Sequence, residues 1–103
     1  MLINKGYSVG DIVSFKLVNG DEVVGKIAEV KDDAWQVDRP CTVVPSQQGI
    51  GLMQSLFSAD LNTPVEIRRE HVMMHAPVIA QLESHYIQTT TGIETVPKGS
   101  ILK

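Results

Sequence analysis

The chain has 103 residues, of which 12 are acidic and 9 are basic, so its formal net charge is −3. This length predicts one domain with a core of its own, and the hydrophobic fraction of 43% excludes a chain that is disordered throughout. The lone Cys41 cannot form a disulfide within the chain, which is typical of a reducing compartment. Taken alone, the acidic balance argues against a nucleic-acid partner.

The stretch from Pro40 to Ala59 contains no charged residue. It also contains two prolines and two glycines, which interrupt a helix, so this stretch is unsuited to crossing a membrane. We therefore expect a cytoplasmic protein with no membrane partner.

A β-hairpin is predicted near the start of the chain. Alternate residues from Val13 to Leu17 are apolar, which is the period of a half-buried strand. Asn19-Gly20 follows and tolerates the positive φ that a tight hairpin turn requires. A return strand then runs from Val23 to Val30, and its alternation slips after Ile27, as a β-bulge would cause.

Beyond a turn at residues 31–34, alternation predicts a third strand from Trp35 to Val43, with an edge or a kink at Pro40. After another turn, the segment 50–57 fits a strand that pairs back onto residues 41–45. The same segment also fits a helix, so a hairpin and a helical excursion both remain open at this point.

Two short strands are predicted at Val65–Ile67 and Val72–Ala76, around the polar turn Arg68–His71. Apolar residues then recur at spacings of three and four, which predicts a helix over residues 77–90. We expect residues 93–103 to form a tail.

The sequence contains no clear catalytic or metal-binding motif. His71 and His75 lie four residues apart, but on a strand this spacing spans about 13 Å, too far for two ligands of one ion. Cys41 falls on the apolar face of a predicted strand, which indicates a buried and unreactive thiol. Nucleophile-elbow, phosphate-binding glycine-loop and paired-carboxylate patterns do not stand out. We therefore expect a protein that is not an enzyme and that needs no metal or cofactor.

Residues 17–30, with the sequence LVNGDEVVGKIAEV, resemble the first motif of the Sm/LSm family, the group that includes bacterial Hfq. Gly20, Val23 and Gly25 keep the spacing of that motif, with one apolar residue before them and two more after them. Two further segments, residues 51–57 and 86–93, look like parts of small Sm-like proteins from marine tailed phages.

The family motif continues with Asp-x-x-Met-Asn, and residues 32–36 match it once Lys31 is treated as an insertion. Trp35 then stands where the family has Met or His, and Gln36 stands where it has Asn. The second family motif is Ile-Arg-Gly-x-x-Val. Residues 67–72 match it, with arginine in place of the glycine.

The resemblance implies a mostly β fold, namely a small, five-stranded, strongly bent Sm-like (SH3-like) barrel over about residues 10–76, with an added C-terminal helix. Residues 1–103 would form this single Sm-like domain. Sm-like proteins join edge to edge into rings of five to seven subunits, so the resemblance also implies a homo-oligomeric ring. Such pairing would satisfy the open strand edges of a small barrel. For a phage-encoded protein, the cytoplasm would be that of the host cell.

In the family, single-stranded RNA binds around the central pore of the ring. Carried over to this chain, Trp35 would stack on a base, Arg68 would cover the other face of the base, and Gln36 would hydrogen-bond its edge. Asp32 would order the turn, and Arg69 would contact phosphate. These five residues are the expected nucleic-acid-binding site.

The same residues have plainer interpretations. Trp35 has the strand parity of Cys41 and could be a core residue, while Arg68 and Arg69 are flanked by two glutamates and could form a solvated turn. Two functions therefore remain open. One is a ring that binds single-stranded RNA, or DNA, as a chaperone or processing factor. The other is a ring that serves as a structural or adaptor part, for instance in phage assembly, without nucleic-acid contact.

Overall fold

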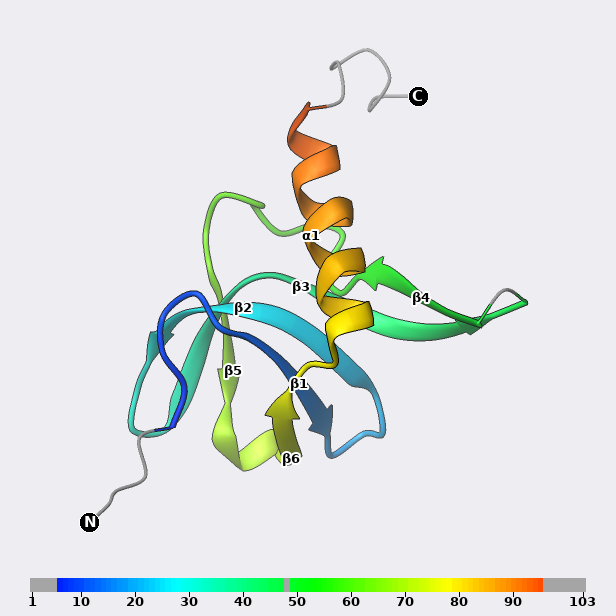
Figure 1. Ribbon diagram of the computed structural model, residues 1–103. Coiled ribbons are helices and arrows are strands. Elements are labelled where there is room, and N and C mark those ends of the chain that lie inside the picture. Colours follow the sequence, from blue (N-terminus) through cyan, green and yellow to red (C-terminus); the bar gives the residue numbers. More distant parts are fainter. Residues whose placement is uncertain (1–5, 48, 96–103) are drawn as a thin grey trace.

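The computed structural model describes residues 6–47 and 49–95 (Figure 1). These residues form one antiparallel sheet of six strands and a C-terminal helix, which confirms the prediction of a mostly β fold with an added helix. The strands are β1 (Ile12–Leu17), β2 (Glu22–Val30), β3 (Ala34–Ser46), β4 (Gly49–Gln54), β5 (Val65–Arg68) and β6 (Val72–Pro77), and the helices are the short 3₁₀ helix η1 (Arg69–His71) and α1 (Ala80–Thr95).

The strand order is β4-β3-β2-β1-β6, and β5 pairs separately with β3. The long strand β3 has two partners: residues 34–37 pair with β5, and residues 41–46 pair with β4. Between these two parts the register against β2 slips, and Arg39 has a φ of 44°, next to Pro40. This β-bulge falls where the sequence predicts an irregularity, and a second slip follows Ile27, also as predicted.

The prediction of five strands is wrong by one, because β4 folds back on the second part of β3. The pairing runs from Cys41 opposite Gln54 to Ser46 opposite Gly49. For the segment 50–57 the hairpin alternative is therefore correct over residues 50–54. Figure 1 shows this hairpin projecting from the body of the sheet.

Two apolar clusters lie on opposite faces of the sheet, because neighbouring residues of a strand point to opposite sides. The cluster on the concave side consists of five buried residues, which are Val13, Phe15, Ile27, Trp35 and Val37. Four partly buried residues pack against it, namely Tyr7, Leu17, Ile67 and Val72. The other cluster lies under α1 and consists of Ile12, Val24, Cys41 and Tyr86.

Gly25 of β2 lies where β3 leaves no room for a side chain. A Cβ atom at this position would collide with the buried side chain of Val37, and it would lie 3.5 Å from both the Asp38 carbonyl oxygen and the Pro40 Cα. The close packing of β2 against β3 therefore requires a glycine here.

The helix begins and ends later than predicted. Pro77 is the last residue of β6, opposite Val13, rather than the start of the helix; a proline is tolerated there because β6 is an edge strand. The helix continues through Gly92 to Thr95, because one glycine costs a helix only about 1 kcal/mol. Residues 93–95 of the predicted tail are thus helical, and residues 96–103 lie outside the described part of the chain.

Tyr86 anchors α1 to the sheet. Its side chain is 1% exposed, its hydroxyl donates a hydrogen bond of 2.6 Å to the Asp38 carbonyl oxygen, and the same hydroxyl accepts one of 3.3 Å from the Lys26 N–H. Ile87, elsewhere on the helix, and Ile79, just before it, remain exposed. One tyrosine therefore fixes the helix against the bulged part of β2 and β3.

The sheet is not closed. Within residues 6–47 and 49–95 no backbone ladder joins β5 to β6, although η1 connects the two strands directly. Ile67 of β5 and Val72 of β6 both pack against the concave cluster. The structure is thus a bent, open sheet, and the closed Sm-like barrel stays a prediction.

Candidate nucleic-acid interface

The structure brings the turn between β2 and β3 against η1. The Arg69 N–H donates a hydrogen bond of 2.9 Å to the Asp33 carbonyl oxygen, and Ala34 lies opposite Arg68 in the ladder. The five residues expected to bind nucleic acid therefore lie around this one junction, although their side chains make different contacts from those expected.

Trp35 lies in the core, with 3% of its surface exposed. Its ring packs against Phe15 at 5.0 Å and against His75 at 5.1 Å between ring centres, and the guanidinium of Arg69 covers it at 4.2 Å. A base can stack only on an open ring face. The predicted stacking role of Trp35 is therefore wrong for this fold, and the core interpretation is correct.

Arg69 acts as a cover over the core. Its Nε and Nη2 donate hydrogen bonds of 3.2 Å and 2.9 Å to the Lys31 carbonyl oxygen while the guanidinium lies on Trp35. These contacts occupy the guanidinium of Arg69, which the family resemblance assigns to phosphate. They also show that Arg69, and not Arg68, is the arginine that faces the tryptophan.

Arg68 points into a group of carboxylates. Its Nε lies 3.3 Å from Glu70 Oε2, its Nη2 lies 3.6 Å from Asp33 Oδ2, and its Nη1 lies 3.7 Å from Glu66 Oε2. The side chain is 46% exposed, so each of these pairs is weak alone. Together they balance the charge of Arg68, whose predicted role at one face of a base stays a prediction.

Gln36 and Asp32 also depart from their predicted roles. The Gln36 amide donates a hydrogen bond of 3.1 Å to Glu66 Oε1, which occupies the group that was expected to recognise a base. The Asp32 carboxylate is exposed and has no hydrogen bond or ion pair within the described part of the chain. The turn is instead closed by the Lys31 N–H, which donates to the Ala34 carbonyl oxygen at 2.9 Å.

The junction carries more negative than positive charge. The ring that the family resemblance implies would gather the arginines at a pore and spread the acids over the outer surface, but the structure interleaves them. Four carboxylates stand against three cations, which leaves one negative charge in excess; the acids are Asp32, Asp33, Glu66 and Glu70, and the bases are Lys31, Arg68 and Arg69. Phosphate attraction by this surface is correspondingly reduced.

Tyr7 and His75 are part of the same site; the sequence analysis did not consider Tyr7, and it considered His75 only as a metal ligand. The Tyr7 hydroxyl and His75 Nδ1 share a hydrogen bond of 2.7 Å, and their rings meet edge to face. Burial, and then the charge of Asp11, raises the pKa of Tyr7. The two residues are 68 positions apart, so no local pattern could have paired them.

The other groups that the sequence analysis considered are metal ligands and the thiol of Cys41. Among the described residues no cluster of three or more His, Cys, Asp or Glu side chains could hold a metal ion. Cys41 is 4% exposed and burial raises its pKa, which confirms the prediction of a buried thiol.

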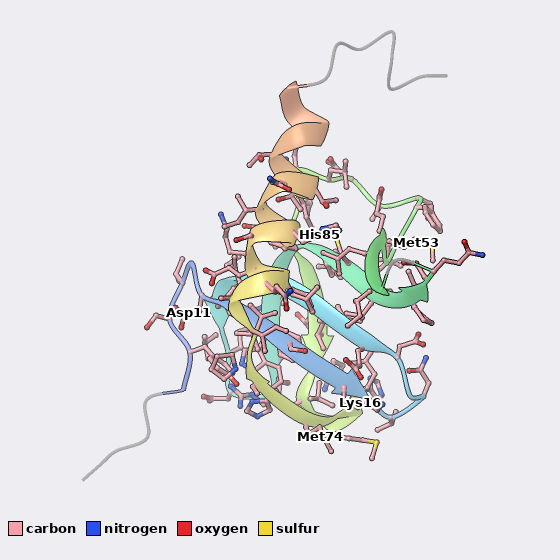
Figure 2. The ribbon with its side chains drawn as sticks, turned by 45° about the vertical axis from the view of Figure 1, so that its right-hand side comes forward. Asp11, Lys16, Met53, Met74 and His85 are labelled. Carbon is pink, nitrogen blue, oxygen red and sulfur yellow. The ribbon has the colours of Figure 1, made fainter. Side chains whose placement is uncertain are left out.

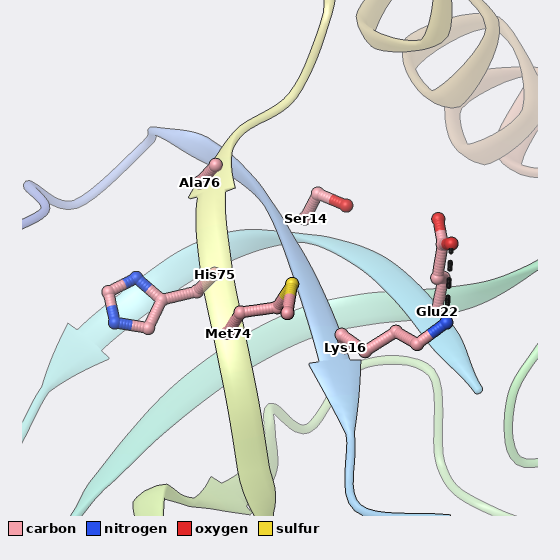
Figure 3. A pocket seen from close by; sticks show the side chains of 6 residues that line it. All are labelled: Ser14, Lys16, Glu22, Met74, His75 and Ala76. Carbon is pink, nitrogen blue, oxygen red and sulfur yellow. Dashed lines mark ion pairs between the residues drawn. The ribbon is translucent and has the colours of Figure 1, made fainter. Parts of the chain in front are cut away.

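A shallow pocket lies between β1 and β6 (Figure 3). Its charged groups pair with each other, because Lys16 Nζ lies 3.8 Å from Glu22 Oε2. Figure 3 shows the Met74 side chain turned toward Lys16, and the His75 side chain turned the other way. In the described part of the chain no buried polar side-chain atom lacks a partner.

The described helices include none that is long and apolar enough to cross a membrane. The candidate interface is a network of ion pairs above a buried tryptophan, with one negative charge in excess. No protein-family model matches this chain, and no curated protein matches it significantly.

Proposed function

We propose that this chain is an Sm-like protein that assembles into a homo-oligomeric ring and works as a structural or adaptor component. The observation that carries this proposal is the exposure of β6. It lies at an edge of the sheet, residues 73–77 are all exposed, and Met73 and Met74 are 60% and 61% exposed. An exposed apolar strand at a sheet edge is a template for pairing with another chain.

A complementary edge exists on the same chain. β5 pairs with β3 on one side only, so its other side is also open within the described residues. Pairing β6 of one copy with β5 of the next would be a head-to-tail contact, which gives a ring when the rotation closes. The resemblance to Sm/LSm motifs supports five to seven copies, and the resemblance to phage segments supports a role in phage assembly.

The junction around Trp35 favours the structural role over nucleic-acid binding. The expected stacking residue is buried, and the two expected arginines already contact carbonyl and carboxylate oxygens. Binding a nucleotide there would require breaking these contacts and exposing part of the core.

The ring is tested by measuring the mass of the full chain by native mass spectrometry. We expect five to seven copies, and we expect Met73→Lys to dissociate them because it places a charge in the β6 edge. Val9→Lys adds the same charge at a residue that is 72% exposed and lies outside the strands, so it should leave the mass unchanged. A monomeric parent chain, or an unchanged mass for Met73→Lys, would overturn the ring.

A second candidate function is binding of single-stranded RNA, or DNA, at Arg68 and Arg69. The observation that favours it is that both arginines are exposed on neighbouring positions of one turn, which a ring would repeat around its axis. Titration with labelled oligo-U, oligo-A and single-stranded DNA at two salt concentrations tests it. Saturable binding that weakens with salt, and that is lost in Arg68→Ala but kept in Lys16→Ala, would support this function. No binding at low salt would exclude it.

A further inference from the structure

β4 presents a free backbone edge. The Ser55 N–H donates to the Pro40 carbonyl oxygen at 3.0 Å, and hydrogen-bonded positions alternate along an antiparallel pair. Ile50, Leu52 and Gln54 therefore turn their N–H and C=O groups away from β3. In the part of the chain that the structure describes, no strand pairs with that side of β4.

Charged side chains and prolines in an edge strand discourage its pairing with a further strand. β4 carries neither, and the whole run from residue 40 to residue 59 is free of charge. Figure 2 shows Met53 of β4 well separated from Met74 of β6, so this edge is distinct from the one proposed for the ring.

We propose that β4 pairs with β4 of a second copy of this chain, antiparallel, across a two-fold axis at Leu52. Each chain carries a net charge of −3, so copies repel unless they meet through a neutral surface, and β4 provides one. The same neutrality offers nothing to phosphate groups of a nucleic acid or a lipid surface. A contact of this kind is self-complementary, since both copies use the same residues.

The side chains fit this register. With Leu52 at the axis, Met53 of each copy lies opposite Gly51 of the other. Met53 is 44% exposed, and Gly51 has no side chain to obstruct it; even a Cβ there would only touch Val44, at 3.7 Å. Ile50 is 55% exposed and lines a groove with Leu82 of α1 and with Ile79, which precedes the helix, so each end of the paired strands adds apolar contact.

The contact is small. A stable interface buries about 800 Å² per partner, whereas one edge strand and the groove beside it offer less than that. We therefore expect the pair of copies to dissociate on dilution, in contrast to the ring, which uses different edges.

Sedimentation of the full chain over a concentration series tests the contact. The mass of the parent chain should double with concentration, whereas Ile50→Lys and Ile50→Pro should hold it at the lower value. Val18→Lys, at a residue of the β1–β2 turn that is 57% exposed, adds the same charge elsewhere and should behave as the parent. Met73→Lys should break the ring into smaller units, but the mass of these units should still double with concentration. This result would distinguish the β4 contact from the ring contact. A parent chain that never doubles, or doubling that survives both Ile50 variants, would overturn the proposal.

Cross-linking tests the register. Hydrogen-bonded antiparallel partners have Cα atoms about 5.5 Å apart, which suits a disulfide. Leu52→Cys should therefore form a covalent dimer under mild oxidation, and circular dichroism would verify that this variant is folded. Ile50→Cys should form no covalent dimer, because Ile50 pairs with Gln54 of the second copy. The parent chain should form none either, because Cys41 is buried. Equal cross-linking of Leu52→Cys and Ile50→Cys, or none in folded Leu52→Cys, would overturn the register.

Discussion

The guanidinium of Arg69 lies 4.2 Å from the centre of the Trp35 ring, so an arginine fills the place where a base would have to stack. The same guanidinium donates two hydrogen bonds to the Lys31 carbonyl oxygen. The junction is therefore closed by the chain's own side chains, and it contributes to the stability of the fold.

Removing Arg69 should uncover the tryptophan. Trp35 is the one tryptophan of the chain, so its fluorescence reports on this site alone. In Arg69→Ala we expect a red-shifted emission, stronger quenching by acrylamide, and a loss of about 1 kcal/mol in the free energy of unfolding. Arg68→Ala removes an equal charge that does not touch the ring, and its spectrum should match the parent. Identical fluorescence spectra for Arg69→Ala and Arg68→Ala would disprove the claim that Arg69 shields Trp35 from solvent.

Replacing Tyr86 by phenylalanine should weaken the attachment of α1. The change deletes the bond to the Asp38 carbonyl oxygen and leaves the Lys26 N–H without its partner. We expect a loss of about 1–3 kcal/mol in the free energy of unfolding, measured by urea denaturation. Tyr7→Phe removes a hydroxyl whose one hydrogen bond among the described residues is to the exposed His75, and it should cost less. A smaller effect at Tyr86 than at Tyr7 would argue against the anchor.

The same tyrosine should make stability depend on pH in the alkaline range. Burial raises the pKa of Tyr86 well above its ordinary value of 10.0. The unfolded chain therefore releases the phenolic proton first, so the stabilisation is complete below pH 10 and falls as the pH rises further. Urea midpoints at about pH 9 and about pH 11 should differ more for the parent than for Tyr86→Phe. The two proteins would lose stability equally if Tyr86 ionised normally in the folded state.

Gly25→Ala should strain the sheet. The added methyl group meets the buried, β-branched side chain of Val37 with backbone atoms of β3 close behind, so it has nowhere to move. We expect a loss of about 2 kcal/mol or more in the free energy of unfolding. The double variant Gly25→Ala/Val37→Ala should lose less free energy of unfolding than the sum of the losses of the two single variants, because the added and the removed methyl groups occupy the same space. Simple additivity would mean that the collision is relieved elsewhere.

Sequence reasoning recovered what depends on local periodicity. The β1–β2 hairpin, the bulge after Ile27 and the burial of Cys41 all follow from alternation and turn residues that are close in the chain. It misplaced the helix because Pro77 and Gly92 are boundary signals that tertiary pairing and a continuous helix override here.

The candidate site was harder to predict, because it depends on which of two neighbouring arginines faces inward. The 3₁₀ turn directs Arg69 onto Trp35 and Arg68 toward Glu66 and Glu70. A motif match fixes only positions along the chain, so it did not reveal which arginine contacts the tryptophan. The pairing of Tyr7 with His75 left no local signal at all.

The mass of the intact assembly tests the central claim most directly. Native mass spectrometry of the full chain, at a concentration low enough to separate copies that pair through β4, should show one ring of five to seven subunits. A chain that stays monomeric under these conditions would contradict the account, because the exposed β6 edge would then have no partner of its own kind.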